Sequence, residues 1–493
     1  MTTIVERTSS GIIYKASQQR DFPQLDLLSL LFDSPACGAK EDTVVHADAA
    51  DPSKAVTKGQ LRHLVKRLAH TLGQRYGIGR DGPNKDVVLC ISSGHFLLPC
   101  LFYSTIAAGG IFSSSSPACT ATELAGQITQ VGAKLILCNE DTKEVAAAAA
   151  KLANVPGSRA CLVLDPAREH EAARGRDMSK DYRTIAHLPA AHIAGAQNYF
   201  VNSFYVGGTL YWMPRFDFTK FLKYNKKYRV TTLASVPPIY LAIAKSPLVT
   251  DQFDSLEWAV AGAAPMGKEL QQAARKKLGK GKARLTQTWG LSETTGAMTT
   301  MPRGFDDETG SVSMLVMNGQ ARIVDDDGKD VEPGQAGEIW VKGPNVTKGY
   351  YKNDAANKEA FVDGWFCTGD IGVFKDGKFY IVDRKKELIK YKGLQVAPAE
   401  LEALLVSHAK IADAAVIGVE GEETEVPRAY VVAGDANLKA DEIVDWVASK
   451  VANHKKLRGG VVFIDAIPKS PSGKILRKEL RQLAKRQDKG SKL

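Results

Sequence analysis

The feature that most constrains the fold is the alternation of short apolar runs with helix-like segments through the first third of the chain. Thr57 stands as a candidate N-cap before an apolar stripe at helical spacing, and a second helix is predicted over Thr122–Val131. Runs rich in β-forming residues flank that helix, at Val87–Ile91, Lys134–Cys138 and Cys161–Asp165. Strands that alternate with helices favour a largely parallel sheet covered on both faces, so the predicted fold class is α/β.

The pattern changes twice further along the chain. More strands are predicted at Val230–Val236, Trp258–Ala261 and Arg284–Thr288, and shorter runs separated by Asp and Gly turns then indicate a β-rich subdomain over about residues 310–383. From Pro398 onward, helices and strands indicate an α+β unit of about a hundred residues, an ordinary domain size. We therefore predict a large N-terminal domain of layered sheets and helices over residues 1–383, a hinge at 384–386 and a small mobile α+β domain over 387–493. The Ser113–Ser116 run is predicted as a loop and helix cap.

Charge and cysteine usage exclude several classes of protein. The formal net charge is +10, and residues 452–493 hold 12 Lys or Arg against three Asp or Glu, so the excess is concentrated in this segment. Such a basic segment fits a phosphorylated ligand, nucleic acid or solubility, but it carries no nucleic-acid-binding pattern, so we expect no nucleic-acid partner. The seven cysteines form no CxxC pair, which indicates reduced thiols, and no apolar run reaches the length of a membrane span. We expect an intracellular protein without a membrane span.

Five short segments carry residues typical of a chemical site. Taken singly, each has a structural interpretation as a turn, a helix cap or a solvated basic face, because short motifs are frequent by chance. In chain order they are Ala261-Gly-Ala-Ala-Pro265, Thr288-Trp-Gly-Leu-Ser-Glu-Thr294, Gly364-Trp-Phe-Cys-Thr-Gly-Asp370, the stretch from Asp383 to Gln395, and Pro468-Lys-Ser-Pro-Ser-Gly-Lys474. Together, the chain closely resembles the adenylate-forming, AMP-binding superfamily from about Thr43 to Arg477, specifically its acyl-CoA synthetase and 4-coumarate–CoA ligase-like branch.

The resemblance implies an ATP-dependent acid–CoA ligase. A small-molecule carboxylic acid would react with ATP to give an acyl-adenylate and pyrophosphate, and then with coenzyme A to give acyl-CoA and AMP, with Mg²⁺ as the metal. Small residues would let the backbone approach adenine closely, an aromatic ring would stack on the base, and a carboxylate would accept hydrogen bonds from the ribose hydroxyls. The nucleotide-binding residues implied are Gly262, Ala263, Ala264, Trp289 (where the family usually has Tyr), Gly290, Ser292, Asp370 and Arg384.

The same resemblance assigns the metal, the hinge and the principal catalytic residue. Glu293 matches the carboxylate that holds Mg²⁺, a hard cation that prefers oxygen ligands, and Lys386 matches the hinge position. Lys474 matches a lysine that bridges the attacking carboxylate and the α-phosphate, where negative charge accumulates in the transition state.

Three further residues are assigned to the second half-reaction and to the acyl pocket. In the resembling enzymes the small domain rotates and presents a second face for coenzyme A, on which Lys390 and Gln395 match implicated positions. His192 lies in a segment, Leu188–Gly195, that resembles the wall of the acyl pocket. A structural hydrogen-bonding role is the alternative for this histidine.

One signature of the superfamily is missing from this sequence. A Ser/Thr/Gly-rich loop ending in Pro-Lys-Gly, whose backbone N–H groups wrap the β- and γ-phosphates, is expected before Leu188. The chain has only the charged stretch Pro166–His187 there. The segment Gly262–Lys268 nearly spells a Walker phosphate loop, but the next residue is Glu269, which has no hydroxyl donor and repels phosphate, so this match is accidental.

Three explanations of the missing loop stay open. The segment is lost from this sequence, or the protein binds nucleotide or acyl-adenylate without making it, or Arg168, Arg174 and Arg176 form a looser phosphate clamp. The first is favoured because the downstream catalytic set is intact, and the last is disfavoured because scattered arginines do not supply convergent amides. The alternative function is therefore a catalytically impaired homologue or truncated isoform that binds nucleotide or acyl ligand without adenylating.

The final tripeptide, Ser491-Lys492-Leu493, matches a peroxisomal targeting signal that an import receptor reads. The residues before it are polar, as an accessible tail requires. We therefore expect a peroxisomal protein whose partners include the peroxisomal import receptor, and the alternative is a basic terminus without a targeting role.

Overall fold

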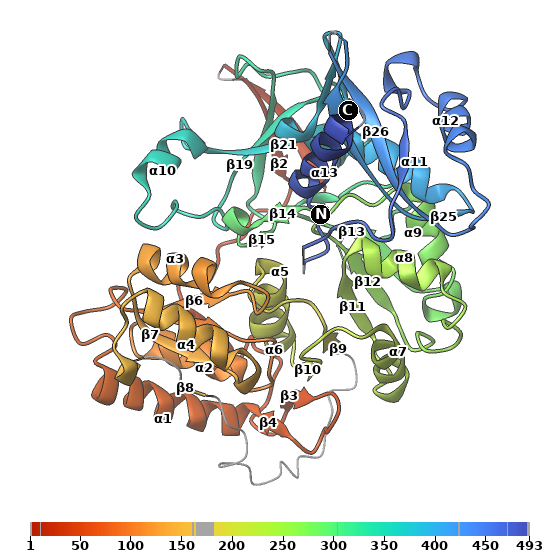
Figure 1. The fold of residues 1–493 in the computed structure, drawn as a ribbon. Helices are drawn as coiled ribbons and strands as arrows, with labels where there is room; N and C mark the ends of the chain where they lie inside the picture. The colour runs from red at the N-terminus through yellow and green to blue at the C-terminus, as the bar shows by residue number, and fades with distance from the viewer. Residues whose placement is uncertain are drawn as a thin grey trace.

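The computed structural model describes residues 2–9, 11–159, 162–163, 182–302, 304–422, 424–470 and 472–490. Within these ranges the fold is mixed α/β, with several sheets and their covering helices in the large N-terminal part and a smaller α+β part at the C-terminus (Figure 1). The predicted fold class is confirmed. No helix in these ranges is long and apolar enough to cross a membrane. Arg168, Arg174, Arg176 and the terminal tripeptide lie outside the described residues.

A four-stranded parallel sheet in the order β6-β5-β7-β8 occupies the first third of the chain. Its central strand β5 is buried at every residue, as expected for a parallel strand covered on both faces. The strands are β5 (Val87–Ile91), β6 (Ile111–Ser115), β7 (Ala133–Cys138) and β8 (Leu162–Val163), and the helices are α1 (Lys58–Tyr76), α2 (Leu98–Ala107), α3 (Ala121–Val131) and α4 (Lys143–Leu152).

Local signals in the sequence account for most of these boundaries. Thr57 and Gln60 form a reciprocal capping box at the start of α1, and Gly77 ends this helix in the left-handed region at φ 66°. The prediction that Ser113–Ser116 forms a loop is wrong for Ser113–Ser115, because these residues pair with β5 as part of β6. The cap of α3 is Thr120 instead.

Two more sheets follow and carry the first part of the site; all their strand pairs are parallel except β3 with β4, which is antiparallel. One has the order β4-β3-β10-β9 and the other the order β11-β12-β13, and the Thr231 N–H donates to the Arg183 carbonyl between them at 3.0 Å. The strands are β3 (Val44–Asp48), β4 (Ala55–Thr57), β9 (Arg183–Ala186), β10 (Thr209–Trp212), β11 (Thr232–Ser235), β12 (Trp258–Ala261) and β13 (Arg284–Gln287), and the helices are α5 (Ile193–Ala196), α6 (Ser203–Tyr205), α7 (Phe218–Lys227), α8 (Pro237–Lys245) and α9 (Lys268–Arg275).

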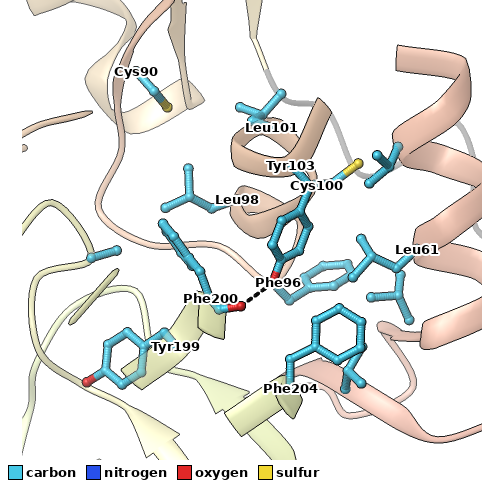
Figure 2. Packing of buried hydrophobic residues seen from close by; sticks show 14 of the residues in the cluster. Leu61, Cys90, Phe96, Leu98, Cys100, Leu101, Tyr103, Tyr199, Phe200 and Phe204 are labelled. Carbon is cyan, nitrogen blue, oxygen red and sulfur yellow. Dashed lines mark hydrogen bonds between the residues drawn. The ribbon is translucent and has the colours of Figure 1, made fainter. Parts of the chain in front are cut away.

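A large aromatic core joins α1 and α2 to the segment that follows α5. Figure 2 shows the Tyr103 hydroxyl donating to the Phe200 carbonyl, with Phe96 and Phe204 packed nearby. Phe200 belongs to a short π-helical segment, Gln197–Asn202, directly after α5. This core therefore fixes the segment that begins at His192.

The β-rich part is a seven-stranded antiparallel sheet that also includes the N-terminal hairpin. Its order is β1-β2-β18-β19-β21-β20, with β22 paired to β21, and Tyr14 of β2 stands opposite Ala321 of β18. The N-terminal contribution was not predicted. The elements are β1 (Thr3–Thr8), β2 (Gly11–Ala16), β18 (Gln320–Val324), β19 (Gly337–Lys342), α10 (Asp354–Ala360), β20 (Phe361–Val362), β21 (Trp365–Lys375) and β22 (Lys378–Arg384), preceded by the small hairpins β14 (Gly290–Leu291) with β15 (Gly296–Ala297) and β16 (Thr299–Thr300) with β17 (Met314–Leu315).

The C-terminal part has a hydrophobic cluster of its own between its helices and its three-stranded sheet. It lies beside α8 and α9 of the N-terminal part, where α11 contacts α9 (Figure 1). The domain boundaries at 383 and 387 stay a prediction. The elements are β23 (Ile389–Tyr391), β24 (Leu394–Val396), α11 (Pro398–Ser407), β25 (Ile411–Glu420), β26 (Glu425–Ala433), α12 (Ala440–Ala448), β27 (Val461–Phe463) and α13 (Arg477–Gly490).

Candidate active site

A cavity of about 540 Å³ lies between the N-terminal and C-terminal parts. Its walls come from the start of α8, the loop after β12, residues 288–290 after β13, strands β21 and β22, helix α11, and the segment 469–477. Eight of the residues assigned from the sequence line this cavity: Ala263, Ala264, Trp289, Gly290, Asp370, Arg384, Lys386 and Lys474. Motifs that are more than two hundred residues apart in the sequence therefore share one site, although their individual roles stay predictions.

Asp370 is the polar centre of the N-terminal wall. It is 5% exposed, and its carboxylate accepts a hydrogen bond from the Trp289 indole N–H at 2.8 Å and pairs with Arg384 Nε at 3.1 Å. Burial raises the pKa of Asp370, while the Arg384 guanidinium and the indole N–H oppose that rise. Both partners favour the ionised carboxylate, so this group can accept hydrogen bonds from ligand hydroxyls in the cavity.

The loop after β12 gives the cavity a wall of backbone and small side chains. Ala263 has φ 71°, a left-handed conformation that costs energy for a residue with a Cβ atom and that often occurs at functional sites. Gly262 does not line the cavity, and a Cβ atom there would meet Thr288 Cγ2 at 3.0 Å. Gly290 lines the cavity, and the fold leaves no room for a side chain there. A Cβ atom at this position would lie 1.8 Å from the Gly296 carbonyl oxygen.

Lys474 enters the cavity from the C-terminal part on a tight turn. The Gly473 N–H donates to the Ser470 carbonyl at 2.8 Å with φ 80° at Gly473, and the Lys474 N–H donates to Ser470 Oγ at 3.1 Å. Burial lowers the pKa of Lys474 and the nearby Arg384 lowers it further, whereas the Asp370 and Glu293 carboxylates oppose the shift. The ammonium group thus lies among the side chains that the sequence motifs bring together.

Glu293 and Ser292 lie at the edge of the site and do not line the cavity. Both belong to a short 3-10 helix, Ser292–Thr294, and the Tyr350 hydroxyl donates to Glu293 Oε1 at 2.7 Å. Among the described residues, no group of three or more His, Cys, Asp or Glu side chains could hold a metal ion. Magnesium often binds through one or two carboxylates together with substrate phosphates and water, so a single carboxylate beside the cavity fits this ion.

His192 lies near the site but outside the cavity wall. Its side chain caps α5, because Nδ1 accepts a hydrogen bond from the Ala194 N–H at 3.2 Å. Burial lowers the pKa of His192, and the positive charge of Lys474 lowers it further. His192 therefore has the structural hydrogen-bonding role that was the alternative in the sequence analysis. Its role in the acyl pocket stays a prediction.

Lys390 and Gln395 lie apart from the cavity. They are register partners in the two-stranded β23–β24 hairpin, and both are exposed. Lys386, in contrast, lines the cavity next to Lys385, whose Nζ pairs with Asp326 Oδ1 at 2.9 Å and Glu338 Oε2 at 3.2 Å. In this orientation the C-terminal part thus presents Lys474 to the cavity and the hairpin to solvent.

Three polar residues at the cavity received no role from the sequence: Asp383, which is buried, and Glu402 and Arg477, which are mostly buried. Arg477 Nη2 contacts both carboxylate oxygens of Glu402 at 2.8 Å, and Asp383 Oδ2 accepts a hydrogen bond from the Ala399 N–H at 2.9 Å. Asp383 and Arg477 lie within the part of the chain that resembles the superfamily. The residues next to them in sequence do not indicate which groups they pair with. Glu402 follows the predicted start of α11 without any sequence signal for an ion pair.

This fold, with a cavity between a large and a small part that is lined by Trp289, Asp370 and Lys474, is typical of an adenylate-forming enzyme. The family model described as AMP-binding enzyme matches residues 166–351, and the model of the AMP-binding enzyme C-terminal domain matches residues 400–474. A putative acyl-coenzyme A synthetase of Emericella nidulans is 43% identical over 96% of this chain and 98% of its own length. The chain belongs to the AMP-binding, adenylate-forming enzymes, which confirms the family resemblance.

Other relatives and solved structures agree with this assignment. The phenylacetyl-CoA ligase epaB of Aspergillus niger is 32% identical over 93% of this chain and 97% of its own length. The crystal structure of ATP-bound MatB from Rhodopseudomonas palustris superposes with a TM-score of 0.78 at 24% identity, over 93% of this chain and 98% of MatB. The anthranilate CoA ligase AuaEII in complex with anthranoyl-AMP superposes with a TM-score of 0.80 at 18% identity, over 94% and 98% of the two chains. The similarities to MatB and AuaEII show a shared fold only.

The alignments also show that this chain is shorter than its relatives. The match with the Emericella nidulans protein spans 547 positions, although 96% of a 493-residue chain is about 473 residues, so about 70 positions of the relative face gaps in this chain. The match with epaB spans 531 positions over 93% of the chain and has a similar shortfall. The sequence therefore lacks several tens of residues that these proteins contain.

Proposed function

We propose that this protein is an ATP-dependent acid–CoA ligase that works through an acyl-adenylate. The observation that supports this most strongly is the position of Lys474, which lies in one cavity with Trp289, Asp370 and Arg384. A cation at this place suits a reaction in which negative charge develops on a carboxylate and an α-phosphate at once. The specific carboxylic acid is left open, because apolar pockets discriminate weakly between similar acids.

In the first half-reaction, a carboxylate oxygen of the acid attacks the α-phosphorus of ATP, and the bond to pyrophosphate breaks. Asp370 would accept hydrogen bonds from the ribose hydroxyls, and Trp289 would form the wall beside the base. Lys474 would bridge the attacking carboxylate and the α-phosphate and would stabilise the charge that develops between them. Arg384 orients Asp370 through their ion pair.

In the second half-reaction, the sulfur of coenzyme A attacks the acyl carbon and AMP leaves. The C-terminal part would rotate about residues 384–386, withdraw Lys474 and bring Lys390 and Gln395 to the cavity. Both residues are exposed on the β23–β24 hairpin in the present orientation, which leaves them available for such a step.

Magnesium would be held by Glu293 together with the phosphates of ATP. When bound, it would neutralise phosphate charge, which hard cations do through oxygen ligands. The Tyr350 hydroxyl, which donates to Glu293 Oε1 at 2.7 Å, would hold this carboxylate in place. Tyr350 would thus affect the metal only by holding the Glu293 carboxylate in position.

A second candidate is a protein that binds nucleotide or acyl-adenylate without forming it. The missing phosphate loop and the shortfall of about 70 aligned positions favour it. The cavity residues that would contact adenylate are present in this chain, whereas the Ser/Thr/Gly-rich loop expected to bind pyrophosphate is missing from the sequence. This candidate predicts that acyl-adenylate binds but that ATP and acid release no pyrophosphate.

Pyrophosphate release with ATP, Mg²⁺, coenzyme A and a panel of aryl and alkyl acids discriminates the two candidates. The assay uses this chain and a version that carries a Ser/Thr/Gly-rich loop grafted from a relative between residues 166 and 187. Release from either version, with matching acyl-CoA formation, supports the ligase. No release from both versions, in proteins that still bind AMP, contradicts it.

We also propose that the protein is imported into peroxisomes through Ser491-Lys492-Leu493. The support is the sequence of the tripeptide and the polar residues before it. A peroxisomal address suits an enzyme that supplies acyl-CoA, since the product is a substrate for oxidation reactions.

A further inference from the structure

Helix α11 begins without a capping side chain of its own. Its N-cap residue is Ala397, whose methyl group accepts no hydrogen bond, and Pro398 follows in the first turn. The N–H groups of a first turn have no partner inside the helix, so one of them here requires an external acceptor. Such caps are usually supplied by Ser, Thr, Asp or Asn at the N-cap position itself.

The acceptor comes from the other side of the hinge. Asp383 is the second-to-last residue of strand β22 and directly precedes residues 384–386. Its Oδ2 accepts the hydrogen bond from the Ala399 N–H at 2.9 Å, while its Oδ1 accepts from the Arg384 N–H at 2.7 Å. The side chain is buried, at 4% exposure. A carboxylate at a helix N-terminus is also favoured by the helix dipole. This cap therefore links the N-terminal part to the C-terminal part across the segment about which rotation is expected.

We propose that Asp383 is a positioning residue that caps α11 in trans and thereby stabilises the orientation in which Lys474 lies in the cavity. Rotation about residues 384–386 would carry α11 away from Asp383 and break this hydrogen bond. The Asp383 carboxylate and the Ala399 N–H would then have to hydrogen-bond to water instead. Assigning this orientation to the adenylation step rests on the proposed function, but the cap itself does not. A second contact across the same boundary, from Lys245 to the Ile411 carbonyl, is independent of Asp383.

The geometry also offers a covalent lock for this orientation. A Cβ atom built on Gly267, at the start of α9, would lie 3.0 Å from the Ala403 Cβ atom of α11. This separation is about 0.5 Å shorter than the shortest usual Cβ–Cβ distance of a disulfide, so a small outward shift of α11 should let the Gly267→Cys/Ala403→Cys variant oxidise near the present orientation. The oxidised protein then defines the unrotated state in any measurement.

The test measures the ratio of rotated to unrotated molecules by single-molecule energy transfer. Dyes are attached to Ser53→Cys and Ala436→Cys, two exposed positions on opposite sides of the hinge, and the oxidised lock gives the reference signal. Loss of an N-cap shifts such an equilibrium by between about twofold and thirtyfold. We expect Asp383→Ala to raise the ratio within this range and Asp383→Asn, which keeps an acceptor, to raise it less.

Two control variants separate positioning from general stability. Asp376→Asn changes an exposed aspartate at the other end of the same β21–β22 hairpin and should leave the ratio unchanged. Ala397→Ser supplies α11 with a cap that travels with it, so it should raise the ratio without lowering the thermal midpoint. A merely structural role for Asp383 would instead lower the midpoint and leave Ala397→Ser without effect on the ratio.

The two proposals can fail separately. Conversion of preformed acyl-AMP and coenzyme A to acyl-CoA should be unchanged or faster in Asp383→Ala, because the rotated state serves that step. An unchanged ratio in Asp383→Ala, in a protein that remains folded, overturns the trans cap whatever the activity. Absence of acyl-CoA in all variants, together with the expected change in ratio, contradicts the ligase and leaves the cap intact.

Discussion

Replacing Arg477 by Met should destabilise the C-terminal part strongly, although the charge removed lies on a basic segment. Arg477 Nη2 contacts both oxygens of Glu402 at 2.8 Å, and the two side chains are only 15% and 13% exposed. Glu402 accepts one further hydrogen bond, from the Val416 N–H at 2.9 Å. Removing one member of a buried ion pair leaves the other charge uncompensated, which costs about 3–5 kcal/mol.

The double variant Glu402→Met/Arg477→Met should recover most of this loss. Replacing both members of a buried pair by apolar side chains of similar length is often neutral, so we expect a cost below about 2 kcal/mol. The segment after Lys474 is anchored by the same pair, so Arg477→Met should also weaken the delivery of Lys474 to the cavity. Together with the Glu402→Met single variant, these two variants form a cycle whose coupling energy is expected to be large and favourable.

Hydrogen exchange resolves this effect in the C-terminal part alone. A loss of about 3–5 kcal/mol accelerates exchange by about a hundredfold or more where amides exchange through opening of that unit. Peptides that cover β25, including Val416, should show this acceleration in Arg477→Met and little of it in the double variant. Peptides that cover β5 in the N-terminal part are the internal control. Additive single costs, or exchange in β25 that does not change, would refute the reasoning.

Three further predictions concern catalysis, the metal and localisation. Lys474→Ala in a loop-bearing version should lower adenylation by about 10²–10³-fold and affect transfer from preformed acyl-AMP to coenzyme A much less; equal losses would contradict the two-orientation mechanism. Tyr350→Phe, which frees Glu293 of its hydroxyl partner, should raise the Mg²⁺ concentration needed for half-maximal pyrophosphate release by about tenfold, and an unaltered Mg²⁺ dependence would argue against this metal position. Deleting residues 491–493 from a fluorescently tagged chain should move it from puncta to the cytosol. If the intact chain stays diffuse in cells that import a control peroxisomal cargo, the peroxisomal assignment is wrong.

Local sequence patterns predicted part of the fold, chiefly strands of the parallel sheets and the helices with clear caps or apolar stripes. Trp258–Ala261 forms β12 with the predicted ends, and Thr57 caps α1, because strand alternation and capping depend on residues close in sequence. The gathering of Trp289, Asp370 and Lys474 in one cavity was expected only through the family resemblance. Periodicity and composition do not contain that information, since the three residues come from different elements.

Contacts between distant segments could not be predicted. The N-terminal hairpin β1–β2 was not predicted, and its partner β18 lies more than three hundred residues away in the sequence. The pairing of Glu402 with Arg477 and the cap from Asp383 depend on how α11 packs against the rest of the chain. A buried polar group obtains its partner from the tertiary fold, so its sequence neighbours carry no signal for it.

The central claim is that the cavity between the two parts is an acyl-adenylate site, and calorimetric titration with a non-hydrolysable acyl-sulfamoyl adenosine tests it most directly. This ligand needs no pyrophosphate site, so the missing loop does not affect the measurement. We expect one ligand per chain, and affinity about tenfold or more weaker in Asp370→Ala, which removes a charged acceptor worth about 1.5–3 kcal/mol. Asp376→Asn, on the same hairpin, should bind as the unaltered chain does. No binding by the folded protein, or equal affinity in Asp370→Ala, would contradict the account.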